Sequence, residues 1–179
     1  MVESKNVSST NGELNTDDMI GQIDRLRLRS HRAGRAHYLA AHRSGTMQIL
    51  LGIPAVIFST AVGTAIFGTL ASSPHRVVVV VAGAVSVASA VLSALQIFLG
   101  YPERSENHRI AGSHYMALKR QLDVEILHLK AGHGRIDDRI SELSAFVNKF
   151  NALEAESPRV PDRFYDRARQ EQAADTEGI

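Results

Sequence analysis

The chain of 179 residues contains no cysteine, so disulfide bonds and thiolate chemistry are both excluded. This absence agrees with a reducing environment around the polar parts of the chain. Charge is also absent from two long stretches, residues 47–71 and 77–101. Each stretch has 25 residues. A helix of that length spans about 37 Å, which is enough to cross a hydrocarbon core of about 30 Å.

These charge-free stretches predict transmembrane helices rather than buried helices of a soluble bundle. Bundle helices usually carry a polar residue every turn or two, because some face of each helix meets water. Here the polar interruptions are Gln48, Gln96 and scattered serines and threonines. The valine run at 77–81 is the only strand signal, and the length of the apolar block that it opens favours a helix. The first stretch begins too late and is too long for a secretory signal.

The segment between the stretches, Ser72–Arg76, is so short that it allows only a helical hairpin, with both chain ends on one side of the membrane. The positive-inside rule identifies that side. The loop has Arg76 as its single arginine or lysine, whereas many flank the hairpin at its other end. They are Arg25, Arg27, Arg29, Arg32, Arg35 and Arg43 before the first stretch, and Arg104, Arg109, Lys119 and Arg120 after the second. Both termini are therefore predicted to be cytoplasmic.

The predicted fold class is an all-α membrane protein: a two-transmembrane helical hairpin with one N-terminal and two to three C-terminal cytoplasmic helices. Gly45 offers a joint before the membrane, and the segment Gly132-His133-Gly134 interrupts the C-terminal extension. The predicted segments are a disordered polar tail at 1–15, a basic cytoplasmic helix at 16–45, the hairpin at 46–101, a helical extension at 102–156, and a short C-terminal helix and tail at 157–179.

Apolar residues at helical spacing indicate which faces of the cytoplasmic helices pack against a partner. They are Ile23, Leu26, Ala33 and Ala40 in the first helix; Ile110, Ala117, Leu118, Leu122, Ile126 and Leu129 after the second stretch; and Ile136, Ile140, Leu143, Val147 and Phe150 in the next helix. Within the first stretch, Pro54 predicts a kink, which is either a gate element or a fit to the packing.

The two charge-free stretches contain small and hydroxyl side chains at regular spacing, which let helices approach closely in lipid. The candidates for helix packing or for a pore lining are Ser59, Gly63, Thr64, Ser86, Ser89, Ser93 and Gln96. One interpretation is that the polar stripe of the second stretch lines a pore or a polar seam in an oligomer. The other is that serine and threonine bond to their own backbone inside a packed hairpin. Neither stretch contains an ionisable group, which argues against a proton relay or an ion-coupled transporter.

The sequence shows no catalytic, cofactor or metal site. It has no glycine-rich phosphate loop, no nucleophile elbow and no paired catalytic carboxylates. No two histidines stand four residues apart, and Glu125 with His128 would need a second copy of the same spacing to hold a metal. An enzyme is therefore not expected, and the anionic leaflet is a simpler partner for the arginines than nucleic acid.

The segment that leaves the second stretch, Phe98–Leu122, resembles the signature of the SLATT superfamily, the SMODS- and SLOG-associating two-transmembrane effector domains of bacteria. The family pattern is an acidic residue after the second span, followed by H-x(2)-A-x(3)-Y-x(2)-L-x-R. Residues that match are Glu103 or Glu106, His108, Ala111, Tyr115, Leu118 and Arg120, and a closing segment matches with Pro158, Pro161 and Tyr165. The resemblance covers about residues 17–170.

This resemblance implies a bacterial inner-membrane effector of a nucleotide-signalled antiphage or conflict system, which forms pores that depolarise the membrane. The residues are compatible with this role, since His108, Tyr115 and Arg120 are expected on a helix continuous with the second span, so that a rotation sensed there would reach the membrane. The alternative is that these three residues hold the cytoplasmic helices together. Two helices cannot enclose a channel, so the expected partners are the lipid bilayer, further copies of this chain, and a separate nucleotide-signalling or sensor protein. The alternative is a membrane anchor or scaffold whose cytoplasmic helices recruit a partner without forming a pore.

Overall fold

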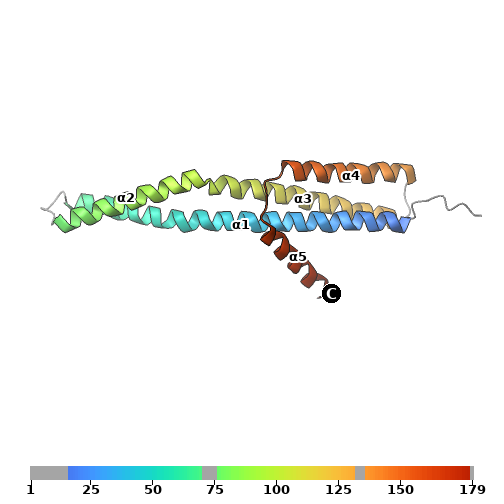
Figure 1. The fold of residues 1–179 in the computed structure, drawn as a ribbon, viewed down its shortest axis with the longest axis horizontal. Helices are drawn as coiled ribbons and strands as arrows, with labels where there is room; N and C mark the ends of the chain where they lie inside the picture. The colour runs from blue at the N-terminus through green and yellow to red at the C-terminus, as the bar shows by residue number, and fades with distance from the viewer. Residues whose placement is uncertain (1–15, 70–75, 132–135, 178–179) are drawn as a thin grey trace, which may run out of the picture. The chain divides into compact units, whose positions relative to one another are not determined.

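The protein is built from helices alone in the residues that its computed structural model describes, 16–69, 76–131 and 136–177 (Figure 1). No strand occurs in these ranges, so the predicted all-helical class is confirmed. The expected polar tail at 1–15, the loop at 72–75 and the break at 132–134 lie outside the described residues. The helices are α1 (Thr16–Thr69), α2 (Arg76–Leu99), α3 (Tyr101–Lys130), α4 (Ile136–Glu156) and α5 (Asp162–Glu177).

Helix α1 runs without interruption for 54 residues. The joint expected at Gly45 is therefore wrong, because a single glycine costs only about 1 kcal/mol in a helix that gains one backbone hydrogen bond per added residue. Pro54 also lies within α1.

A break does occur between α2 and α3, at Gly100. This glycine has a φ of +55°, a conformation that disfavours side chains with a Cβ atom. Its amide donates to the carbonyl oxygen of Ile97 (3.3 Å), and its own carbonyl accepts from the amide of Arg104 (3.1 Å). A helix continuous from the second apolar stretch to His108 was expected, and this expectation is wrong. The left-handed conformation of Gly100 interrupts the helix, so that α2 ends at Leu99 and α3 begins at Tyr101.

The chain divides into two compact units. The first comprises residues 1–31 and 115–155, and the second comprises 32–114 and 156–179. In the first unit Ile23 of α1 and Leu118 and Leu122 of α3 are almost fully buried. Tyr115 (2 % exposed) packs edge-on against Phe150 of α4, with ring centroids 5.6 Å apart. Burial of these large side chains supplies the driving force for this unit.

The predicted apolar stripes are buried to different extents. The stripe of α1 is confirmed at Ile23, Leu26, Ala33 and Ala40, which are all buried. By contrast, Ile110, Ile140 and Val147 are 41 %, 42 % and 39 % exposed. A stripe shows that a face favours an apolar partner, but it does not require that the partner belong to the same chain. The side chain of Ile136 lies outside the described residues.

In the second unit the apolar part of α1 lies beside α2, and the two run in opposite directions along their contact. As residue numbers rise in α1, those of the hydrogen-bonding partners fall. The pairs with α2 are Ala55 with Ser89 and Gln48 with Gln96. The same order continues with α3, where Ser105 pairs with Ala41 and His108 with His37.

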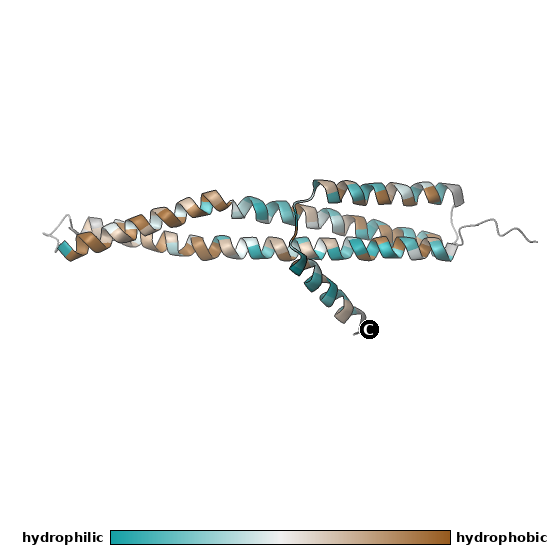
Figure 2. Ribbon diagram, in the orientation of Figure 1, coloured by the Kyte–Doolittle hydropathy of each residue, from teal (hydrophilic) through white to brown (hydrophobic). Residues whose placement is uncertain are grey.

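Hydrophobic residues dominate α2 and the neighbouring part of α1 (Figure 2). Most of these side chains point away from the protein; Ile97 and Phe98, for example, are each 85 % exposed. The structure thus contains two helices that are long and apolar enough, by length and composition, to cross a membrane.

Candidate functional site

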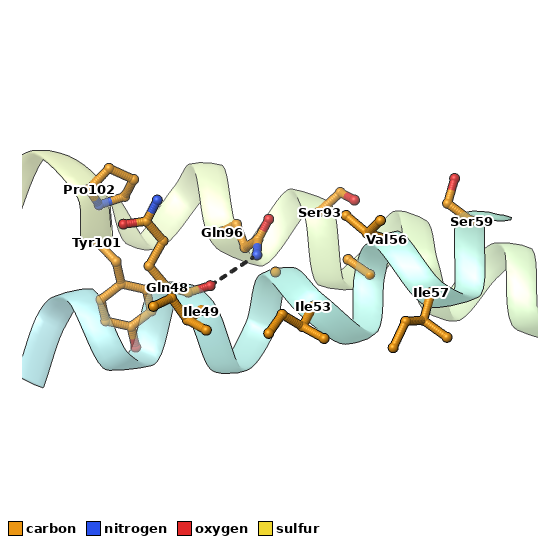
Figure 3. A pocket seen from close by; sticks show the side chains of 12 residues that line it. Gln48, Ile49, Ile53, Val56, Ile57, Ser59, Ser93, Gln96, Tyr101 and Pro102 are labelled. Atoms are coloured by element: carbon orange, nitrogen blue, oxygen red, sulfur yellow. Dashed lines mark hydrogen bonds between the residues drawn. The ribbon is translucent and has the colours of Figure 1, made fainter.

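Where α1 and α2 pack against each other, two polar side chains of α2 form hydrogen bonds with the backbone of α1. The Ser89 hydroxyl donates to the carbonyl oxygen of Ala55 at 3.1 Å, and both residues are buried. Seven residues further along α2, Nε2 of Gln96 donates to the carbonyl oxygen of Gln48 at 3.4 Å (Figure 3). Since helical residues seven apart share a face, Ser89 and Gln96 form a polar seam against α1.

The seam depends on a glycine in α1. A Cβ atom added at Gly52 would lie 2.9 Å from Nε2 of Gln96, closer than such atoms approach. Glycine therefore lets the amide of Gln96 reach the α1 backbone, as small residues do at close helix contacts in membranes.

A groove of about 630 Å³ lies along the same contact (Figure 3). Its wall is mainly aliphatic, with Ser59 and Ser93 among its few hydroxyl groups. The full lining is Gln48, Ile49, Gly52, Ile53, Ala55, Val56, Ile57, Ser59, Ser93, Gln96, Tyr101 and Pro102. An apolar wall with few polar groups suits an acyl chain or an apolar side chain of another helix.

The structure separates the residues predicted to line a pore into groups. Ser89 and Gln96 bond to α1, and Ser59, Ser93 and Gln96 border the groove. Ser86 is exposed on α2 and belongs to neither group. The four polar positions of α2 lie within about 80° of one another around the helix, and only Ser89 and Gln96 of this stripe bond to α1.

Two other predicted packing positions of α1 are Gly63 and Thr64. Thr64 donates to the carbonyl oxygen of Thr60, four residues earlier in its own helix, at 2.7 Å. A Cβ atom at Gly63 would meet no atom within 4 Å. The interpretation that a hydroxyl bonds to its own backbone is thus right for Thr64.

A pair of buried histidines joins α1 to α3 beyond the apolar stretches. Nδ1 of His37 and Nδ1 of His108 lie 3.1 Å apart, so one ring donates a proton and the other accepts it. Burial, reinforced by the neighbouring His108, lowers the pKa of His37 to about 4, and burial also lowers the pKa of His108. Both rings are therefore neutral at pH 7.

The histidine pair was not predicted from the sequence, because helical spacing relates residues of one helix only and these two histidines are 71 residues apart. The sequence did contain one signal: His37 stands on the same helical face as Ala33 and Ala40 of the predicted apolar stripe. All three residues are buried in the structure.

The same helices approach closely around the pair. Ser105 donates to the carbonyl oxygen of Ala41 at 2.9 Å. A Cβ atom at Gly112 would lie 3.2 Å from the carbonyl oxygen of Gly34 and 3.2 Å from the ring of Tyr38. Small and hydroxyl residues thus allow α1 and α3 to pack closely here.

The residues that carry the family resemblance do not form one cluster within either unit. Glu103, Glu106 and Arg120 are exposed. Glu106 pairs with Arg109 at 2.6 Å, and this hydrogen bond lowers the pKa of its carboxyl. His108 belongs to the second unit, whereas Tyr115 belongs to the first, where it packs against Phe150.

Helix α5 is tied to α1 by polar contacts in the second unit. Arg35 forms a salt bridge with Glu171, and Arg32 donates to the side-chain oxygen of Gln172 at 2.6 Å. Hydrogen bonds from Arg35, and from Arg167 of α5, lower the pKa of Glu171. These contacts position the C-terminal helix beside the basic part of α1.

No group of three or more metal-ligating side chains is found among the described residues. Glu125 and His128 lie 3.7 Å apart on α3. Comparison with protein-family models, with curated proteins and with solved structures gives no match for this chain.

Proposed function

We propose that this chain is a membrane protein whose apolar parts of α1 and α2 cross the bilayer as a hairpin with both termini in the cytoplasm. Support comes from the outward-facing apolar side chains of α2, such as Val80, Val87 and Ile97, which are 70 %, 65 % and 85 % exposed. In water such a surface would be unfavourable, whereas in lipid it needs no further cover. The excess of arginine and lysine at one end of the hairpin supports the proposed orientation.

Within that membrane we propose that copies of the chain assemble into a pore. The observation that carries this proposal is the division of hydroxyl groups on α2. Ser89 is used by α1 of the same chain, whereas Ser86 and Ser93 remain exposed on an otherwise apolar helix. Hydroxyl groups that are not bonded to α1 of the same chain can bond to a second copy or line a water-filled path. Two helices alone cannot enclose such a path, so several copies are needed.

The biological role that we propose is a non-enzymatic effector in the inner membrane of a bacterium, controlled by a separate nucleotide-signalling or sensor protein. The similarity of segment Phe98–Leu122 to the SLATT pattern supports this role. Opening of the pore would depolarise the membrane and arrest the cell.

The test is to induce the protein in bacteria and to follow membrane potential with a voltage-sensitive dye. We expect depolarisation by the native chain, and its loss in the double variant S86L/S93L. The matched control is V80L/V87L, which has the same spacing on α2, also replaces exposed residues by leucine, and should leave depolarisation intact. Equal behaviour of the two variants at equal membrane abundance would contradict a serine-lined pore.

The second candidate is a scaffold that recruits a partner without conducting ions. The observation that favours it is the exposed apolar surface of the first unit, at Val124, Leu127, Ile140 and Val147. A scaffold predicts an unchanged membrane potential while the protein is abundant. It also predicts that V124S/L127S abolishes partner recruitment and leaves membrane insertion unaffected.

A further inference from the structure

A second pocket, of about 430 Å³, lies in the second unit where the apolar stretches end. Helices α1, α3 and α5 and the segment before α5 all contribute to it. Its lining is Ala40, Arg43, Ser44, Met47, Tyr101, Arg104, His108, Pro158, Arg159, Pro161, Arg163 and Phe164.

Four of these side chains are arginines, and none of the twelve is an aspartate or a glutamate. The four are exposed, so their guanidinium groups are accessible to a ligand. They come from separate elements: Arg43 from α1, Arg104 from α3, Arg159 from the segment before α5, and Arg163 from α5. Folding of the second unit thus brings together charges that are far apart in the sequence.

The arginines of the pocket differ from other arginines of the same unit. Arg35 pairs with Glu171, and Arg109 pairs with Glu106. Among the described residues, no salt bridge is found for Arg43, Arg104 or Arg159. For Arg163 the contact found is with the ring of Phe164, 4.9 Å from its centroid.

Like charges gathered around one cavity repel each other, and a bound anion removes that cost. Guanidinium groups present paired N–H donors that match the oxygens of a phosphate, and several of them can share its double charge. The hydroxyls of Ser44 and Tyr101 add further hydrogen-bonding groups to the wall. From these observations we propose that the pocket is a binding site for a phosphate-bearing anion.

The phosphate group that these arginines would bind can belong to the headgroup of an anionic phospholipid or to a phosphate in solution. Arg43 stands four residues before the first charge-free stretch, and Arg104 stands three residues after the second. In a membrane-spanning chain the pocket therefore opens at the depth of the cytoplasmic headgroups. The binding site itself does not depend on whether the chain forms a pore.

The experiment uses the purified full-length chain in detergent micelles. One arm measures binding of phosphatidic acid, with phosphatidylcholine as the zwitterionic control, by native mass spectrometry. The other arm measures binding of radiolabelled inorganic phosphate by equilibrium dialysis. The pocket variant is R43Q/R104Q/R159Q. The charge-matched control is R25Q/R120Q/R169Q, which removes three exposed arginines outside the pocket lining. Circular dichroism checks that all the proteins remain helical.

We expect the pocket variant to weaken binding about tenfold or more in at least one arm, since loss of charge-assisted bonds worth about 1.4 kcal/mol has that effect. The control should change binding by less than about twofold, because exposed charges are screened by salt. Loss confined to the phosphatidic acid arm identifies a lipid site, and loss confined to the phosphate arm identifies a soluble ligand. Equal weakening by both variants, or no binding to the native chain in either arm, overturns the proposal.

Discussion

The Nδ1 atoms of His37 and His108 lie 3.1 Å apart between α1 and α3, in a part of the second unit where both rings are buried. Because only one of the two facing nitrogens can carry the shared proton, the pair is favourable when it is neutral and unfavourable when both rings are charged.

This pair predicts that the folded state loses stability as the medium becomes acidic. The pKa of His37 is lowered from 6.5 to about 4, so between these values the unfolded chain binds a proton that the folded chain does not. The free energy of unfolding should therefore be highest above pH 6.5 and should fall as the pH drops towards 4. One pKa unit corresponds to about 1.4 kcal/mol, and screening reduces the effect, so we expect a loss of about 2 kcal/mol. Thermal unfolding in detergent between pH 7.5 and pH 4 measures it.

The control for the acid effect is the variant H37N, which keeps a polar group near the position of Nδ1 but does not titrate. Its stability should be lower at pH 7.5 and should change less between pH 6.5 and pH 4. An acid-induced loss of the same size in H37N would show that other groups cause it.

The contact between Gly52 and Gln96 predicts that a large side chain at position 52 pushes α1 and α2 apart. A Cβ atom there would lie 2.9 Å from Nε2 of Gln96, the movable end of a flexible side chain. We therefore expect G52A to be tolerated by a shift of Gln96, and G52L to destabilise the helix pair by about 1–3 kcal/mol, as overpacking does. Cysteine crosslinking between the two helices measures the pairing, with G63L as the matched control because Gly63 has open space around its Cβ position.

The edge-on contact of Tyr115 with Phe150 predicts that the first unit depends on these two rings. Tyr115 is 2 % exposed and Phe150 is 5 % exposed, so Y115A and F150A should each cost about 3–5 kcal/mol in unfolding free energy. The two losses should not add, because one contact is removed in both variants. The half-exposed Ile110 supplies the control: I110A should cost much less than either, and an equal cost would argue against a core centred on Tyr115.

The left-handed conformation of Gly100 predicts opposite effects for two glycine-to-alanine changes. G100A should destabilise the chain by about 1 kcal/mol, because an L-residue is strained at a φ of +55°. G83A, within helix α2 and without near neighbours at its Cβ position, should stabilise it by about 0.5–1 kcal/mol. Thermal unfolding of both variants checks the difference in sign.

Much of the fold could be predicted because helical periodicity and charge-free length are local properties of the sequence. The buried stripe with Ile23, Leu26 and Ala33 is an example. The histidine pair and the arginine pocket could not be predicted in the same way. Their members are far apart in the chain, by 71 residues for His37 and His108. Only the packing of α1 against α3 and α5 brings them together. The break at Gly100 was missed because a glycine inside a long apolar block is usually tolerated within a helix.

That break makes the two apolar helices mechanically different. Helix α1 continues as one helix through its apolar part, with Pro54 as the one position there whose backbone cannot donate a hydrogen bond. Helix α2 is separated from α3 by Gly100 alone, and its φ of +55° lies in the region that favours glycine. The second unit thus contains one continuous helix beside a pair of helices that are joined at a glycine. Successive residues of a helix are about 100° apart, so a swivel of about 40° would turn Ser93 into the direction in which Ser89 now points. A rotation of α2 about Gly100 by this amount is the movement that would change which hydroxyl group of α2 faces α1.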